Sequence, residues 1–414
     1  MWLKNVQYLD YNAGSGLSEL VHQKLVSLLK DEGEGGLFLA NPSSRHRLGQ
    51  RVGHHLYQAK SSVAKSLGDR IATDDLFFTS SGTESNQTVI RSAVELGIEA
   101  FFIGSIEHSA TAELLPWLEK KCPLVRVVPV LPQGQYDLAA LAALLDEAKG
   151  LGLKSAFVSL AWVNHETGVI QDIPRLGEVL QAANLATTLH LDAAQAWGKV
   201  PLNLESSPAD YVTLSAHKIG ALAGTGIVWC RKGALVHPLI VGSQQSGLRG
   251  GTENSLGIIA AGIAASELNP VEFQFKTSRL RDHLESFLLQ CNVPVRIWGV
   301  ESPRVGNTSR LGLLGFQRYE NWVELLDLRG FAVSHASACK SQVIEPSGIL
   351  LAMGATKMEA LNSIRVSVGP QNTIEEMDQF GDTLRTLMQL KMGTSESIAA
   401  RPKSSRKRSI ENQI

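Results

Sequence analysis

The sequence predicts an α/β protein with two domains: a large domain with a mainly parallel seven-stranded sheet between helices, and a smaller α+β domain. Three observations lead to this prediction. Apolar, strand-like runs alternate with helical patterns through the first two thirds of the chain, which is typical of a parallel sheet covered on both faces. After about residue 270 short strands and helices follow in mixed order. The length of 414 residues suits two domains better than one.

Seven short apolar runs are predicted as the strands of the large sheet, and two segments between them have helical periodicity. The strands are expected at 76–79, 100–103, 125–130, 156–161, 188–192, 211–215 and 227–231, and the helices at 138–149 and 173–184. Ligands of such sheets lie beyond the carboxyl ends of the strands. We therefore expect a binding site where polar residues follow these strands.

The smaller domain is expected to contain four helices and four strands. The helices are predicted at 273–290, 320–328, 346–353 and from 373 onward, and the strands at 295–298, 309–313, 332–335 and 364–368. The last helix opens with a capping box, Thr373 to Glu376. From residue 393 the chain is rich in Ser, Lys and Arg without periodicity, and we expect a disordered basic tail over 393–414.

Composition excludes several classes of protein. A hydrophobic content of 44% is that of a globular protein, and a net charge of −1 does not indicate a nucleic-acid or membrane binder. The four cysteines have no paired spacing, so neither a zinc site nor a disulfide framework is indicated. We find no signal-peptide pattern and no apolar run near the ~18 residues of a membrane span. We expect a cytoplasmic location.

Lys218 and Asp192 both follow apolar strands, and together they predict a cofactor. A lysine at the end of a buried strand is partly desolvated, which lowers its pKa and makes its amine nucleophilic. Ser215 and His217 beside it offer donors to an anion. This combination suits a lysine that forms a Schiff base with a phosphorylated aldehyde, namely pyridoxal phosphate (PLP). Asp192 would keep the pyridine nitrogen protonated, so that the ring can act as an electron sink.

Ten short motifs occur in an order that resembles one enzyme family. They are YLDYNA (8–13), NPSSRHRLG (41–49), FTSSGTESN (78–86), EH (107–108), NHETG (164–168), DAAQ (192–195), SAHK (215–218), GLRGGTEN (247–254), SAC (337–339) and SIRVSVG (363–369). From about Tyr8 to about Leu387 the chain resembles the cysteine desulfurases, which are PLP enzymes of aminotransferase fold type I, class V. This resemblance implies domains of residues 15–270 (PLP-binding) and of residues 1–14 with 271–392 (carrying the catalytic cysteine loop).

The resemblance assigns the cofactor contacts. Gly82 and Thr83 open a helix after a strand, where free amides and the positive dipole end favour an anion, and they would bind the PLP phosphate. Ser215, His217 and Thr252 would complete the phosphate shell, with Thr252 reaching across from a second subunit. Such shared sites imply a symmetric homodimer.

Further roles around the cofactor ring follow from the same resemblance. Asp192 would pair with the pyridine nitrogen, Gln195 would hydrogen-bond the ring hydroxyl, and His108 would stack on the ring and move protons. His165 stands where the family usually has Asn. It can still donate a hydrogen bond to the cofactor, but it is bulkier and can titrate.

Cys339 and Arg365 are predicted to act on the substrate. Cys339 lies in a loop of small and polar residues, and Lys340 beside it favours the thiolate. The resemblance makes Cys339 the nucleophile that takes up sulfur, whereas Cys122, Cys230 and Cys291 are expected to be inert. Arg365 would hold the α-carboxylate of the amino-acid substrate by a bidentate contact, assisted by Asn41.

The predicted function is an L-cysteine desulfurase, which converts L-cysteine to L-alanine with a persulfide on Cys339 that is passed to a sulfur-acceptor protein. The alternatives are a selenocysteine lyase or another class V PLP enzyme, and a catalytically weakened sulfur-relay component, which His165 would favour. The sequence leaves open whether the sulfur serves iron–sulfur assembly, tRNA thiolation or DNA phosphorothioation. The basic tail would dock an acidic acceptor or nucleic acid.

Overall fold

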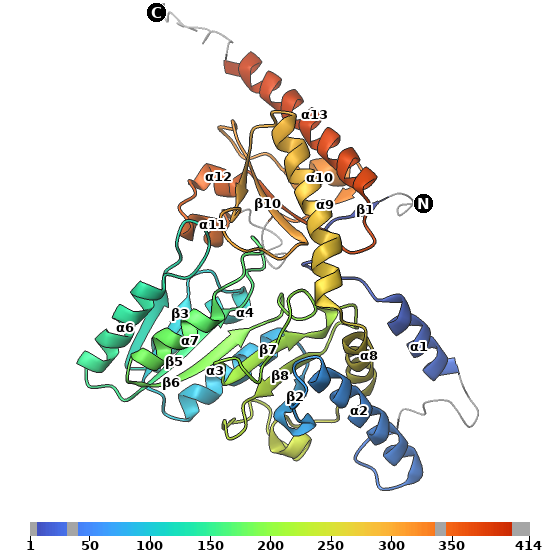
Figure 1. Ribbon diagram of the computed structural model, residues 1–414, viewed down its shortest axis with the longest axis vertical. Helices are drawn as coiled ribbons and strands as arrows, with labels where there is room; N and C mark the ends of the chain where they lie inside the picture. The colour runs from blue at the N-terminus through green and yellow to red at the C-terminus, as the bar shows by residue number, and fades with distance from the viewer. Residues whose placement is uncertain (1–5, 31–39, 336–344, 400–414) are drawn as a thin grey trace, which may run out of the picture.

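The computed structural model describes residues 6–30, 40–335 and 345–399, with the side chains of 393–399 left out. Its elements form two groups (Figure 1). The seven-stranded sheet with its helices occupies the lower part of the view, and a three-stranded sheet with α9 and α13 occupies the upper part. The α/β fold with a mainly parallel seven-stranded sheet is thus confirmed.

The seven predicted strands all form the large sheet, in the order β2-β8-β7-β6-β5-β3-β4. They are β2 (Leu76–Thr79), β3 (Ala100–Gly104), β4 (Leu124–Val128), β5 (Ser155–Ala161), β6 (Ala186–Asp192), β7 (Tyr211–Ser215) and β8 (Gly226–Cys230). β8 runs antiparallel to both of its neighbours, β2 and β7, and the other pairs are parallel. The carboxyl ends of β3, β6 and β7 therefore meet at one edge of the sheet.

Helices cover both faces of the large sheet. They are α1 (Glu19–Lys30), α2 (Arg47–Lys65), α3 (Gly82–Glu95), α4 (Ser109–Ala112), α5 (Leu115–Leu118), α6 (Leu138–Gly150), α7 (Ile173–Ala182) and α8 (Ser255–Ser266), with 3-10 turns η1 (Thr73–Asp75), η2 (Ala216–Lys218) and η3 (Gln245–Gly247). The side chains of β3 alternate between the faces, because Phe101 packs in the cluster that includes α3, and Phe102 in the cluster that includes α6. This two-sided burial explains why the strands are continuously apolar.

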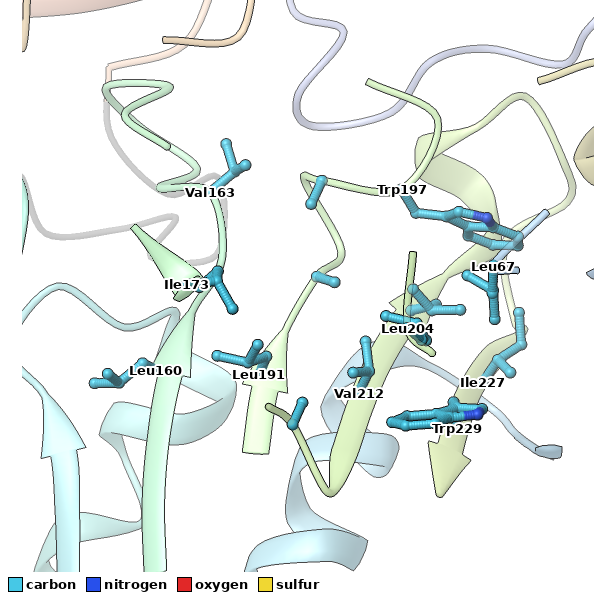
Figure 2. Packing of buried hydrophobic residues seen from close by; sticks show 14 of the residues in the cluster. Leu67, Leu160, Val163, Ile173, Leu191, Trp197, Leu204, Val212, Ile227 and Trp229 are labelled. Atoms are coloured by element: carbon cyan, nitrogen blue, oxygen red, sulfur yellow. The ribbon is translucent and has the colours of Figure 1, made fainter. Parts of the chain in front are cut away.

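The larger core cluster lies against one face of this sheet (Figure 2). Leu191 and Val212 contribute from neighbouring strands, and Trp197 contributes from the turn that follows β6. The indole Nε1 of Trp197 donates a hydrogen bond of 3.0 Å to Ser66 Oγ. The turn after β6 is thus anchored by a large buried side chain.

The second group of elements is built on an antiparallel sheet in the order β12-β10-β9 and a two-stranded parallel pair, β1-β11. Its elements are β1 (Gln7–Tyr8), α9 (Pro270–Gln290), β9 (Val295–Trp298), β10 (Thr308–Leu313), α10 (Trp322–Asp327), β11 (Phe331–Ala332), α11 (Gly348–Ala352), α12 (Lys357–Leu361), β12 (Ser363–Ser367) and α13 (Ile374–Ala399). A separate core cluster holds most of these elements together, and it includes Leu9 from the N-terminal segment. The buried side chains of α11 and α12 belong to the larger cluster instead.

Three details of this second group differ from the sequence analysis. The chain forms α12, which was not predicted, and the strand expected at 332–335 is reduced to β11 and an isolated bridge from Ser334 to Arg365. α13 continues to Ala399, so the expectation of a disordered tail from residue 393 is wrong for 393–399; residues 400–414 lie outside the described part.

Within the part of the chain that the structure describes, no single helix has the length and apolar composition to cross a membrane. Only α8 and α9 taken together would pass, with a bend of 79° between them.

Candidate active site

A pocket opens at the carboxyl edge of the large sheet, and most of the predicted site residues line it. These are Gly82, Thr83, His108, His165, Asp192, Gln195, Ser215, His217, Lys218 and Arg365. They come from the ends of β2, β3, β5, β6 and β7 and from β12 of the other sheet. The structure therefore joins the two groups of elements at this pocket.

The N-terminus of α3 forms one end of the pocket. Ser81 caps this helix, since its side chain accepts a hydrogen bond of 3.1 Å from the Glu84 amide. Gly226 allows this turn to lie close to β8, because a Cβ there would come within 2.3 Å of the Ser81 carbonyl carbon. Opposite, Ser215 Oγ lies 3.0 Å from His217 Nδ1. Free amides and hydroxyl donors at a helix N-terminus suit a phosphate group.

His217 is a neutral imidazole near pH 7. Burial, helped by the neighbouring Lys218, lowers the pKa of the His217 side chain to about 4. Before an anion binds, the His217 side chain is therefore a hydrogen-bonding group and not a cation.

Asp192 ends β6 and is held by two donors. Its Oδ1 accepts a hydrogen bond of 2.9 Å from the Ala194 amide, and its Oδ2 accepts one of 2.7 Å from Asn86 Nδ2. Asn86 is buried in α3, and its Oδ1 has no partner among the described residues. These bonds fix the carboxylate in the pocket wall, where it can accept a hydrogen bond from a protonated ring nitrogen and keep that nitrogen protonated.

Two imidazoles, His108 and His165, meet in the pocket with their rings edge to face and their centroids 5.1 Å apart. His108 caps α4 and accepts a hydrogen bond of 3.1 Å at Nδ1 from the Ala110 amide. Burial lowers the pKa of His108, and it lowers that of His165 well below 6.5, to which His108 adds a smaller effect. Both rings can therefore serve as neutral hydrogen-bonding groups near pH 7.

Lys218 projects toward the N-terminal segment. Its Nζ donates hydrogen bonds of 2.6 Å to the Asn12 carbonyl and 2.9 Å to the Ala13 carbonyl. Gln195 Nε2 donates to the same Asn12 carbonyl at 2.9 Å. This amine thus lines the same pocket as the start of α3 and the Asp192 carboxylate.

Arg365 lies on β12, in the second group of elements, and lines the same pocket. Its Nη2 pairs with Asp10 Oδ1 at 2.7 Å, and its Nη1 donates to the His165 carbonyl at 2.9 Å. Its Nε is buried and has no partner among the described residues. Part of this guanidinium is thus available for an anionic ligand in the pocket.

Comparisons with known proteins agree with this geometry. The aminotransferase class-V family model matches residues 7–380. Cysteine desulfurase 2 of Trichormus variabilis is 37% identical over 91% of both chains, and cysteine desulfurase NifS of Azotobacter vinelandii is 34% identical over 90% of both chains. A NifS-like protein of Rickettsia africae has a similar structure, with a TM-score of 0.82 and 28% identity over 93% of this chain and all of that one.

This chain belongs to the cysteine desulfurases of the class-V aminotransferases. Cysteine desulfurases depend on PLP, and the pocket fits this cofactor. It offers an amine on Lys218, a carboxylate on Asp192, and the amide and hydroxyl donors at the start of α3. Asn86 and Arg365 also line it, and among the described residues their buried Oδ1 and Nε atoms have no hydrogen-bond partner.

Two predicted site residues of the cysteine desulfurase pattern do not line the pocket. Thr252 is exposed and borders a neighbouring hollow with Thr79 and Ser80. Asn41 is also exposed, and its Oδ1 accepts a hydrogen bond of 2.9 Å from the Ser43 amide. Cys339 lies outside the described residues.

The structure also adds residues that the sequence analysis did not single out. Asn12 and Asn86 line the pocket, and Lys199 contacts both Asn12 and Gln195 from behind it. Asn12 and Asn86 belong to motifs that carry the family resemblance, which was the available signal. Lys199 follows the DAAQ motif in a turn, and nothing in its local sequence distinguishes it from a surface lysine.

Proposed function

We propose that this protein is a PLP-dependent L-cysteine desulfurase, in which Lys218 holds the cofactor and Cys339 takes up the sulfur. The observation that carries this proposal is the placement of Lys218, Asp192 and Arg365 around one pocket. An amine, a carboxylate and a carboxylate-binding guanidinium are the groups needed to hold a pyridine aldehyde and an amino acid together.

PLP, when bound, supplies an electron sink for the substrate α-carbon. Asp192 would accept the pyridine N–H, and Gln195 would donate to the ring hydroxyl. The α3 N-terminus with Gly82 and Thr83, together with Ser215 and His217, would hold the phosphate. His165 would contact the ring from the side of His108.

Arg365 would bind the substrate α-carboxylate. Because Arg365 and Lys218 line the same pocket, this contact would place the α-carbon near the Lys218 amine, which can take a proton from that carbon and return one. His108, beside Asp192, would move a second proton. Asn41, which is exposed and does not line the pocket, would assist Arg365 in binding the substrate carboxylate.

Cys339 would attack the substrate sulfur as a thiolate. The S–S bond forms while the C–S bond breaks, and the electron pair of that bond stays with the carbon fragment, which is protonated to alanine. Cys122 and Cys230 are unsuited to this role, because burial raises their pKa to about 11 and about 12. The persulfide on Cys339 would then pass to a sulfur-acceptor protein, for example in iron–sulfur assembly.

The proposal includes a homodimer, because Thr252 is exposed outside the pocket of its own chain and would serve the pocket of a partner subunit.

We further propose that the chain divides into two domains near residue 270, with residues 1–14 joined to the second domain. The pairing of β1 with β11 and the bridge from Asp10 to Ser367 support it. A cytoplasmic location is proposed as well, in keeping with free Cys122, Cys230 and Cys291.

Replacing Cys339 by Ser tests the proposed chemistry. We expect the variant to bind PLP and cysteine, because Lys218, Asp192 and Arg365 are unchanged. It should not form alanine, since a hydroxyl is not ionised near neutral pH and is a poor nucleophile toward sulfur. Absorbance of the bound cofactor and alanine release measure the two properties.

The matched control is Cys122→Ser, which should form alanine at the wild-type rate. In the wild type, a cysteine pulse should leave one extra sulfur on the Cys339 peptide. The mechanism is refuted if Cys339→Ser releases alanine at a near-wild-type rate. Wild-type protein that holds PLP but releases no alanine would instead support a sulfur-relay role.

A further inference from the structure

Lys199 is a buried lysine behind the pocket to which the proposed chemistry gives no role. It lies in the turn after β6, and only 3% of its surface is exposed. Burial lowers its pKa well below 10.5, and the cations Lys218 and Arg365 lower it further. Burying an amine in such surroundings costs stability unless its hydrogen bonds are satisfied. The hydrogen-bond partners of the Lys199 amine therefore indicate its role.

Both partners of Lys199 are amide oxygens. Its Nζ donates to Asn12 Oδ1 at 2.7 Å and to Gln195 Oε1. Gln195 Nε2 in turn donates to the Asn12 carbonyl at 2.9 Å. The Gln195 amide thus lies between an amine, which donates, and a carbonyl, which can only accept. Of its two possible orientations, only the one with Oε1 toward Lys199 satisfies both neighbours.

The orientation of Gln195 matters because of what lies next to it. The Asn12 carbonyl that accepts from Gln195 Nε2 also accepts from Lys218 Nζ, at 2.6 Å. The aldehyde and the hydroxyl of PLP are on adjacent ring carbons, so a group beside the cofactor-linked amine is beside the ring oxygen. Gln195 Nε2 carries a second N–H besides the one that it donates to Asn12, and this second N–H would face the ring oxygen, whereas the flipped amide would present its own oxygen.

The surroundings hold Lys199 at a defined place. Trp197, in the same turn, is fully buried in the main core near Leu67 (Figure 2). On the other side, Asn12 Oδ1 also accepts a hydrogen bond of 3.0 Å from Asn307 Nδ2. The amine is therefore fixed relative to Gln195 by the fold, before any ligand binds.

We propose that Lys199 is a positioning residue that holds the Gln195 amide with its N–H toward the ring oxygen of the cofactor. This inference rests on the proposed contact between Gln195 and the ring hydroxyl. A donor to that oxygen stabilises its ionised form and lowers the proton affinity of the imine nitrogen linked to Lys218. The visible absorbance of the bound cofactor reports this protonation directly.

The test is a pH titration of cofactor absorbance in Lys199→Met and Lys199→Gln. Methionine keeps much of the size but has no donor, so the midpoint should rise by about one pH unit, the effect of one lost hydrogen bond. Glutamine is also uncharged but can donate to Gln195 Oε1, so its midpoint should stay close to wild type. Comparing the two variants therefore distinguishes the effect of the amide orientation on the midpoint from the effect of losing the lysine charge.

Gln195→Ala completes the test. It should raise the midpoint, and adding Lys199→Met to it should cause no further rise, because the lysine acts through Gln195. The inference is overturned if Lys199→Met titrates like wild type, if Lys199→Gln shifts as far as Lys199→Met, or if the double variant shows additive shifts. Should Lys199→Met not fold, Lys199→Ala takes its place, with the same expected rise of the midpoint. Wild-type protein that holds no cofactor would contradict the proposed function itself.

Discussion

At the scale of single residues, Lys218 carries the clearest expectation. Lys218→Ala should lose the covalent link to PLP and all turnover, because the amine that forms the imine is gone. Borohydride reduction of the wild type, followed by peptide mass spectrometry, should find the pyridoxyl group on Lys218. Lys199 is the internal comparison, since its amine also reaches a pocket residue. A label on Lys199 would overturn the assignment.

His165→Asn restores the residue that the family usually has. We expect PLP binding to persist and activity to stay within about tenfold, ~1.4 kcal/mol. The reason is that Arg365 and Asn12 are held by the backbone carbonyl of residue 165, which the substitution leaves in place. His108→Asn, assayed in parallel, should lose more activity. Loss of PLP from His165→Asn would show that the pocket depends on the second imidazole.

Residue-level patterns predicted the pocket well where a polar side chain directly follows an apolar strand. Asp192, Ser215 and Lys218 are all of this kind, and strand ends of a parallel sheet converge. Asn86 and Lys199 were not assigned roles because their contacts depend on how α3 and the turn after β6 pack against other elements. Asn41 was assigned by family resemblance alone, and the structure gives it only a local bond.

At the scale of elements, His190 links three neighbouring strands of the large sheet. Its ring lies 2.9 Å from Ser159 Oγ on β5 and 3.0 Å from Thr213 Oγ1 on β7. Burial lowers the pKa of His190 from 6.5 to about 4. Between these two values the unfolded chain binds a proton that the folded chain does not. The stability contributed by His190 is therefore complete above about pH 6.5 and is lost as the pH falls toward 4.

His190→Gln should weaken this pH dependence. The melting temperature of the wild type should fall between pH 7 and pH 4.5 more steeply than that of the variant, which has no titrating group at this place. Exposed His22 provides the control, because His22→Gln should keep the wild-type slope. Parallel slopes for wild type and His190→Gln would contradict the interpretation.

Helix α8 illustrates a kind of element that is hard to predict from the sequence. α8 is apolar on nearly every side and lies so close to α2 that a Cβ on Gly262 would come within 2.4 Å of the Ala59 Cα. A helix buried all round has no 3.6-residue polar period, so periodicity did not predict it. The amphipathic helices α6 and α7 and all seven large-sheet strands were predicted, because each has a regular pattern or a short apolar run.

For the whole molecule, the basic stretch at 401–408 is expected to serve sulfur delivery. It carries five positive charges, on Arg401, Lys403, Arg406, Lys407 and Arg408. Deleting residues 400–414 leaves α13 intact and should not change alanine release, but it should weaken transfer to an acceptor at low salt. Full-length protein with these five residues changed to Gln should behave like the deletion. Unchanged delivery at low salt would refute this role.

The N-terminal segment has a consequence for how the protein is made. Asn12 and Ala13 supply the carbonyls that hold the Lys218 amine, yet the segment itself is held by late parts of the chain: β1 pairs with β11, and the Asn12 amide bonds to Ser367. A ribosome releases these partners only after the whole large sheet has emerged. Residues 7–13 must therefore wait, unpaired, until residues 331–367 have been synthesised, and this wall of the pocket closes only then.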